Sequence, residues 1–215
     1  LAEVNVQRLP FAILTSKKSG SKVPIEVVEL LHRGGDLERR SWRASPNTEF
    51  GLPGPSAYLL FRALERLVLG RTLGRGAPLT NPQTFEFQDL SQLLGMAEHS
   101  DNREQMRLDL KRIKGTTYIN RGMIRKRLPA RAGARPARAL RSEREEVVSL
   151  IERIVFRHEE LPDGAVATQN QVWFGSFYVD SVNSGYVKPF DWNLWNSFKR
   201  PATRRLFEIL DLRLG

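Results

Sequence analysis

The residues that most favour a chemical function are cationic, and they lie in one stretch of the chain. Between Asp101 and Arg141 there are thirteen Lys or Arg residues and three acids, an excess of ten positive charges. The whole 215-residue chain carries a formal net charge of +10, so the rest of it is neutral. Charge concentrated in one segment creates a local surface for anions. Nucleic acid is therefore the expected partner, and a solvated Arg-rich loop is the alternative.

Within this stretch, residues 100–114 have the pattern of an amphipathic helix. Ser100 suits the N-cap position, and Asp101 and Glu104 lie in the positive first turn. At about 100° per residue, apolar side chains form one stripe and cationic side chains form a second stripe beside it. The apolar stripe comprises Met106, Leu110 and Ile113, and the cationic stripe comprises Arg103, Arg107, Lys111 and Lys114. A helix that packs on a core by one stripe and lies against DNA by the other has this pattern.

The first turns of such a helix meet base edges when the helix enters the major groove. Asn and Gln can pair bidentately with adenine, and Arg can pair with guanine. The DNA contacts predicted on this helix are Ser100, Asn102, Arg103, Gln105 and Arg107 near its beginning, with Lys111 and Lys114 further along. Ordinary solvated helix residues are the alternative interpretation of these positions.

A basic hairpin is expected directly after this helix. Residues 116–119 alternate like a strand and run into an Arg-rich segment, residues 121–142, that is too polar for a core. A strand, a short helix, a tight turn, a basic helix and a basic hairpin follow one another in a winged helix-turn-helix. The wing contacts predicted to phosphate or minor groove are Thr116, Thr117, Arg121, Arg125, Lys126 and Arg127.

Enzymatic chemistry is not expected. The chain has no Cys, which excludes thiolate metal sites, Cys nucleophiles and disulfides. His32, His99 and His158 lie far apart in the sequence and form no metal-binding motif, and no phosphate-binding loop motif occurs. The acidic pairs at 145–146 and 159–160 lie in polar stretches, where such pairs are usually solvated. No catalytic residue, metal or cofactor is predicted.

The composition is that of a cytoplasmic globular protein. Hydrophobic residues make up 40% of the chain, enough to supply a core. No window approaches the roughly 18 to 20 apolar residues that a membrane span needs, and no export signal begins the chain. We therefore expect a cytoplasmic protein without a membrane partner.

The remaining elements are those that would position the basic helix. Residues 25–31 and 38–43 flank the turn 33–36 and predict a hairpin, preceded by an apolar run at 11–14 in a β-rich first fifty residues. The pattern further predicts a helix from Pro55 or Ser56 to near Gly70, a brief strand at 85–87, a short helix from Asp89 to Gly95, strands at 151–156 and 172–179, and helices at 191–198 and 201–214. The predicted fold class is α+β.

Several blocks in this order resemble the replication initiator protein A family of plasmid and secondary-replicon initiators. They are Leu9-Pro-Phe-Ala-Ile-Leu-Thr15, Arg39-Arg-Ser-Trp42, Phe50-Gly-Leu-Pro53, Phe87-Gln-Asp-Leu90 with Leu93-Leu-Gly95, and Gly185-Tyr-Val-Lys-Pro-Phe-Asp191 continuing to Ser197-Phe-Lys-Arg-Pro-Ala-Thr-Arg-Arg-Leu-Phe-Glu-Ile-Leu-Asp211. Each block alone is weakly specific, whereas five in order are moderately specific.

The resemblance implies an initiator that binds repeated double-stranded sites at a plasmid-type origin and represses its own promoter. It also implies two winged-helix domains in tandem, a homodimer, and recruitment of a host helicase or helicase loader. Residues 1–190 would then form the N-terminal domain, and residues 191–215 would open a second, truncated one. A fragment of a longer initiator is one expectation from this ending. A winged-helix transcriptional regulator and a non-specific basic nucleic-acid-binding protein stay open as alternatives.

Overall fold

A computed structural model describes residues 1–15, 20–33, 36–126, 140–141 and 145–214. Over these residues the chain has an α+β fold with antiparallel sheets, which confirms the predicted class. The helices are α1 (Val4–Arg8), α2 (Pro55–Thr72), α3 (Phe87–Leu94), α4 (Ser100–Gly115), α5 (Ser176–Asn183), α6 (Trp192–Ser197) and α7 (Pro201–Leu214), with a 3₁₀ turn at Leu73–Arg75. The strands are β1 (Ala2–Glu3), β2 (Ile25–Arg33), β3 (Asp36–Ser45), β4 (Gln83–Phe85), β5 (Thr117–Arg121), β6 (Arg125–Lys126), β7 (Leu140–Arg141), β8 (Glu145–Val148), β9 (Ile151–Val155), β10 (Asn170–Phe174) and β11 (Val187–Lys188).

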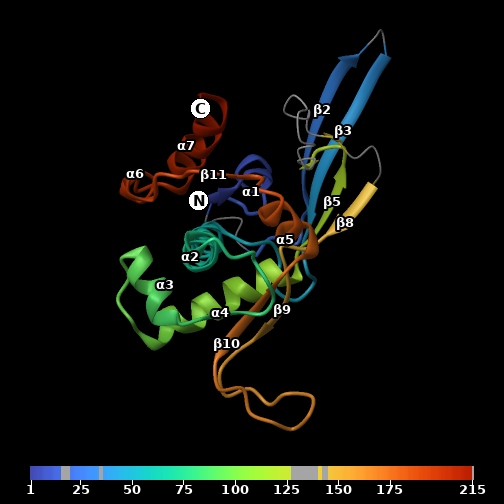
Figure 1. Cartoon of the computed structure of the whole chain (residues 1–215). Helices are drawn as coiled ribbons and strands as arrows, with labels where there is room; N and C mark the ends of the chain where they lie inside the picture. Colours follow the sequence, from blue (N-terminus) through green and yellow to red (C-terminus); the bar gives the residue numbers. More distant parts are fainter. Residues whose placement is uncertain (16–19, 34–35, 127–139, 142–144, 215) are drawn as a thin grey trace.

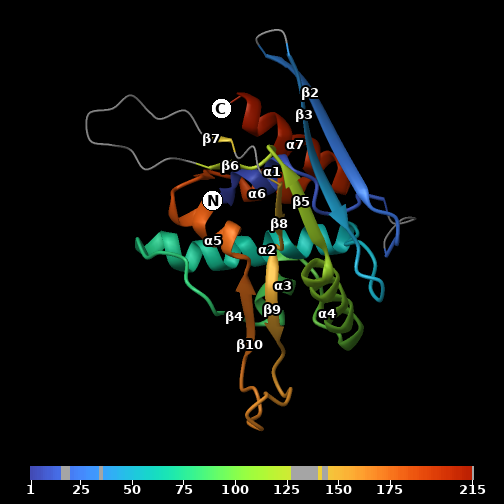
Figure 2. The ribbon, with the colours of Figure 1, turned by 90° about the vertical axis from the view of Figure 1, so that its right-hand side faces the viewer.

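Two larger sheets extend in opposite directions from a helical centre (Figure 1 and Figure 2). One sheet has the order β2-β3-β5-β8, and its long hairpin β2–β3 confirms the hairpin predicted there. The other sheet has the order β4-β10-β9, so its central strand is the last of the three in the sequence. Two short pairs, β1 with β11 and β6 with β7, complete the described strands.

Helix α2 forms the centre of the core. Pro55 occupies its first turn, where the missing N–H of proline costs no intrahelical hydrogen bond. Leu60, Phe61 and Ala63 are almost fully buried on different sides of the helix. A helix that is apolar on most sides is stable only inside a protein.

Within the described ranges, no helix is long and apolar enough to cross a membrane.

The strand predicted at 172–179 is wrong in its second half. Strand β10 ends at Phe174, and α5 begins at Ser176. A Cβ added to Gly175 would lie only 1.8 Å from the backbone oxygen of Ser149, so this contact between segments requires glycine. An apolar run without turn residues fits a buried strand and a buried helix equally well, and tertiary packing decided between them.

The β-rich interpretation of the first residues is also partly wrong. Residues 11–14 form no strand, although Phe11 and Ala12 are buried in the core. The short helix α1 at Val4–Arg8 was not predicted, because five residues give too little periodicity to recognise. By contrast, α7 at Pro201–Leu214 confirms the predicted helix.

A buried network of charges joins α7 to α2. Glu208 is 0% exposed and accepts hydrogen bonds from the Tyr58 hydroxyl at 2.7 Å and from Nε of Arg62 at 2.8 Å. Arg205 donates to the same carboxylate at 2.8 Å. In α6, Trp195 is also 0% exposed. Helices α6 and α7 therefore pack into the same core as α2, and the hypothesis that residues 191–215 also open a second domain stays a prediction.

The N-terminus joins the same network. Nη1 of Arg62 lies 2.6 Å from Glu65, whose carboxylate accepts the backbone N–H of Glu3 at 2.9 Å. The Glu3 side chain is fully buried and accepts hydrogen bonds from Ser181 and from the backbone N–H of Val6. Burial raises the pKa of Glu3 to about 7, against the opposing effect of these donors.

Candidate nucleic-acid interface

Helices α3 and α4 form a helix-turn-helix on the underside of α2. Helix α3 ends at Gly95, whose φ of 66° is the left-handed conformation that glycine adopts without strain. Helix α4 begins at Ser100, and His99 rather than Ser100 occupies its N-cap position. The predicted Ser100 cap is therefore wrong by one residue. The Ser100 hydroxyl contacts Asp101 at 3.3 Å and stays exposed.

The apolar stripe of α4 faces the core as its spacing predicts. Met106, Leu110 and Ile113 are each at most 3% exposed. Asp109 is buried with them and accepts a hydrogen bond from Arg112 at 3.3 Å. Burial raises the pKa of Asp109, and the neighbouring polar groups oppose that shift. These contacts fix the rotation of α4 about its axis and so decide which side chains face solvent.

The predicted base-reading residues lie at the exposed N-terminal end of α4. Arg103 is exposed and pairs with Glu98 in the preceding turn at 2.7 Å. Gln105 is also exposed, while Asn102 is partly buried and donates to the Ala97 carbonyl at 2.8 Å. Arg103 and Gln105 are therefore accessible, whereas Asn102 would have to leave its backbone partner to reach a base.

The cationic stripe divides into two parts. Arg107 is half-buried, lies 3.1 Å from Glu159 and covers the ring of Phe156 at 4.3 Å from its centroid. Its guanidinium therefore ties α4 to the β9–β10 hairpin. Lys111 and Lys114 are exposed on the same helix, and in the described part of the chain neither forms an ion pair; Lys111 lies 5.9 Å from the centroid of the Phe50 ring. These two lysines remain suited to phosphate contacts.

The hairpin beside α4 is β9–β10, and its loop is acidic. Residues 156–169 contain one Arg and three acids. The loop projects beyond α4 at the lower end of the molecule (Figure 1). Arg153 is exposed in β9 and stacks on Trp173 at 4.7 Å from the ring centroid. Sequence reasoning missed this cation, because the local net charge around it is not positive.

The segment predicted to be the wing, residues 116–127, does not form a hairpin beside α4. Strand β5 pairs with β3, Ser45 opposite Thr117, and so belongs to the four-stranded sheet. Thr116 is 0% exposed and donates to the Arg112 carbonyl, so the predicted contact of Thr116 with DNA is wrong in this conformation. The physical reason is that β5 finds an open edge on β3 and extends that sheet instead of forming a separate hairpin.

The other predicted wing residues do not adjoin α4. Arg121 is exposed at the far end of β5 and pairs with Glu145 at 2.5 Å. Strands β6 and β7 lie in the upper half of the view and α4 lies in the lower half (Figure 2). The side chains of Arg125 and Lys126 lie outside the described residues, and so does Arg127. The described residues also contain no cluster of acidic or His side chains that could hold a metal ion.

Comparison with known proteins supports the fold. No family model matches the sequence, and no curated protein matches it. The crystal structure of domain 2 and domain 3 of RctB is 13% identical with a TM-score of 0.59, covering 95% of this chain and 68% of that one. A second crystal structure of RctB domains 2-3 is 12% identical with a TM-score of 0.51, covering 92% and 67%. At these identities the likeness is one of fold.

Proposed function

We propose that this chain is a replication initiator that binds double-stranded origin DNA through a winged helix-turn-helix. The unit consists of α2, β4, α3, α4, β9 and β10. The observation that supports the proposal is the strand order β4-β10-β9 combined with this chain order: α3 and α4 follow β4 across a short turn, and the β9–β10 hairpin lies beside α4, which is the order of elements in a winged helix-turn-helix. In this arrangement α4 is the recognition helix, and the β9–β10 hairpin is the wing.

The chemistry of α4 suits this role. Its N-terminal end presents Arg103 and Gln105, which can pair with guanine and adenine edges in the major groove. Lys111 and Lys114 lie further along the exposed side and would neutralise the phosphates that flank the groove. The acidic loop of the wing disfavours a phosphate contact at its tip, so the wing would touch DNA through Arg153 at its base.

The origin role rests on the sequence blocks together with the fold. Domains 2 and 3 of RctB share this fold. The sequence blocks resemble plasmid initiators. We propose binding to direct repeats at a plasmid-type origin, repression of the chain's own promoter, a homodimer and recruitment of a host helicase or helicase loader.

Selection of bound sequences from a random duplex library tests the proposal. The chain would be used at about 150 mM salt, where surface charge pairing is partly screened. An initiator should recover one motif that recurs as direct repeats in the parent replicon. A motif found singly at promoters would identify a transcriptional regulator instead. Absence of any motif would identify a non-specific binder and overturn the proposal.

The two exposed lysines of α4 give a second test. A Lys111→Ala, Lys114→Ala variant should bind every duplex more weakly, because two phosphate contacts are lost. The slope of log affinity against log salt should flatten by about 1.8, at about 0.9 for each phosphate. A Lys199→Ala, Arg200→Ala variant removes the same charge from the exposed start of α7 and should keep the slope. Equal slopes for both variants would remove α4 from the interface.

A further inference from the structure

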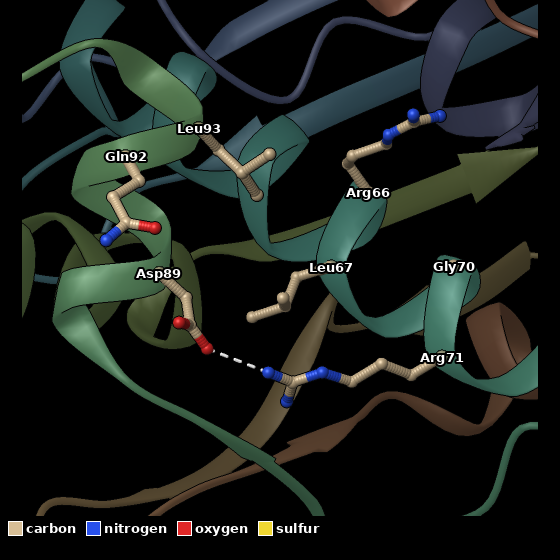
Figure 3. Close-up of a pocket in the computed structure, with 7 residues that line it drawn as sticks. All are labelled: Arg66, Leu67, Gly70, Arg71, Asp89, Gln92 and Leu93. Carbon is tan, nitrogen blue, oxygen red and sulfur yellow. Dashed lines mark hydrogen bonds and ion pairs between the residues drawn. The ribbon is translucent and has the colours of Figure 1, made fainter.

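An open groove lies between the C-terminal half of α2 and helix α3 (Figure 3). Its volume is about 430 Å³, within the range of roughly 300 to 1,000 Å³ that is typical of ligand sites. The lining residues are Arg66, Leu67, Gly70 and Arg71 from α2 and Asp89, Gln92 and Leu93 from α3. None of these residues belongs to α4.

The groove has an apolar middle and charged ends. Leu67 and Leu93 are partly buried and point into the space between the helices (Figure 3). At one end, Arg71 pairs with Asp89 at 2.7 Å, so these two charges neutralise each other. At the other end, the Arg66 side chain is exposed and forms no ion pair with any residue that the structure describes. The charge that remains for an occupant is therefore positive.

Gly70 leaves one wall of the groove flat. It lies inside α2, where glycine is less favourable than alanine. No heavy atom lies within 4 Å of the position that a Cβ would occupy there. The packing of this chain therefore gives no reason for glycine at this position, whereas close approach of another chain would.

The chemistry of the groove distinguishes between classes of partner. A nucleic-acid backbone would bring charged phosphates against the two leucines, which is unfavourable because the phosphates would lose hydration there without gaining hydrogen bonds. A protein segment can place an apolar side chain against Leu67 and Leu93 and a carboxylate against Arg66, so it complements both parts of the groove. Short amphipathic segments bind grooves of this kind through spaced apolar anchors.

We infer that this groove binds a short acidic amphipathic segment of a partner protein. An apolar side chain of the segment lies between Leu67 and Leu93, and a carboxylate pairs with Arg66. The segment passes over Gly70. This site is separate from the DNA-reading surface of α4 and does not depend on DNA binding.

Selection from a random twelve-residue peptide display library on the whole chain tests the inference. The expected peptides combine Leu, Ile or Phe with Asp or Glu. They should bind Gly70→Phe and Arg66→Glu at least tenfold more weakly than the parent chain. Gly70→Ala and Arg153→Glu are the matched controls, a small residue in the same wall and the same charge reversal on another surface, and both should bind normally.

Each contrary result overturns the inference. These results are an absence of enriched peptides, enrichment of basic peptides, binding that Gly70→Phe leaves unchanged, and displacement of the peptides by short random duplex DNA. Urea denaturation of each variant should give the parent's cooperative transition, which separates a blocked groove from misfolding. Duplex binding, measured separately on the same variants, tests the DNA-binding proposal independently, because the groove variants should leave it unchanged.

Discussion

Arg103 has two competing partners. In the free chain it pairs with Glu98, and both side chains are at least 40% exposed. Such exposed pairs contribute about 0 to 1 kcal/mol, because water and salt screen them. A bidentate contact with guanine discriminates by about 1 to 3 kcal/mol. The guanidinium can therefore exchange its carboxylate for a base at little cost.

Replacing Arg103 by Ala should weaken binding to the selected motif by about 1 to 3 kcal/mol and change binding to random duplex little. Fluorescence anisotropy with both duplexes measures the difference. The Glu98→Ala variant is the control, and it should bind the motif as well as the parent or better. An equal loss on motif and random duplex would show that Arg103 contacts phosphate.

Glu3 predicts a pH dependence of stability. Its pKa is raised from 4.5 to about 7 in the folded chain, so between these values the folded state holds a proton that the unfolded state has lost. The free energy of unfolding due to Glu3 is then fully present below pH 4.5 and falls as the pH rises to 7, by about 3 kcal/mol at most. Urea denaturation of the parent and of Glu3→Gln at several pH values measures this difference. The inference fails if both chains depend on pH in the same way.

At the scale of elements, the turn between α3 and α4 depends on Gly95. Its positive φ places a side chain in an unfavourable backbone conformation, although there is open space around it. Gly95→Ala should lower the free energy of unfolding by roughly 1 to 2 kcal/mol. Urea denaturation checks this value. Gly70→Ala is the matched control and should raise stability by up to about 1 kcal/mol, because Gly70 lies inside a helix with open space around it.

The α4 helix and the β9–β10 hairpin act as one element pair. Arg107 joins them through the Phe156 ring and the Glu159 carboxylate. The sequence pattern predicted that Arg107 contacts DNA, whereas in the structure its guanidinium contacts the hairpin and stabilises the hairpin beside the helix. Its position in the cationic stripe could not reveal this, because Glu159 is 52 residues away in the sequence.

At the scale of the whole molecule, α6 and α7 complete the core. Ending the chain at residue 190 would remove Trp195 and Glu208 and leave Arg62 without its carboxylate partner in α7. Breaking a buried ion pair by removal of one partner costs about 3 to 5 kcal/mol, a large part of a domain's stability. The shortened chain should therefore lose its cooperative thermal transition. A chain ending at Leu212, which removes only exposed residues and the terminus, should keep it.

An unchanged transition in the chain ending at residue 190 would instead support a domain boundary at that point. Calorimetry on both chains decides between these outcomes. The test uses only folding as its readout, so it is independent of the origin-binding proposal.

By itself the sequence determined the α+β class, helices α2, α4 and α7, the β2–β3 hairpin and the apolar stripe of α4. These features follow from local properties, namely periodicity, proline at helix starts and glycine at helix ends. The concentration of positive charge in residues 101–141 is equally a property of the sequence. These helices, this hairpin and these side-chain patterns are specified by residues that are close together in the sequence, without information about the rest of the fold.

Only the tertiary structure decided which strands pair and which cations remain free. β5 extends the β2–β3 sheet, so Thr116 is buried and Arg121 lies away from α4. The hairpin that does adjoin α4 comes from residues 151–174, whose loop is acidic. Strand pairing and ion pairing join residues that are distant in the sequence, and packing free energy over the whole chain selects among them. A local sequence pattern therefore cannot predict which strands pair or which charged side chains form ion pairs.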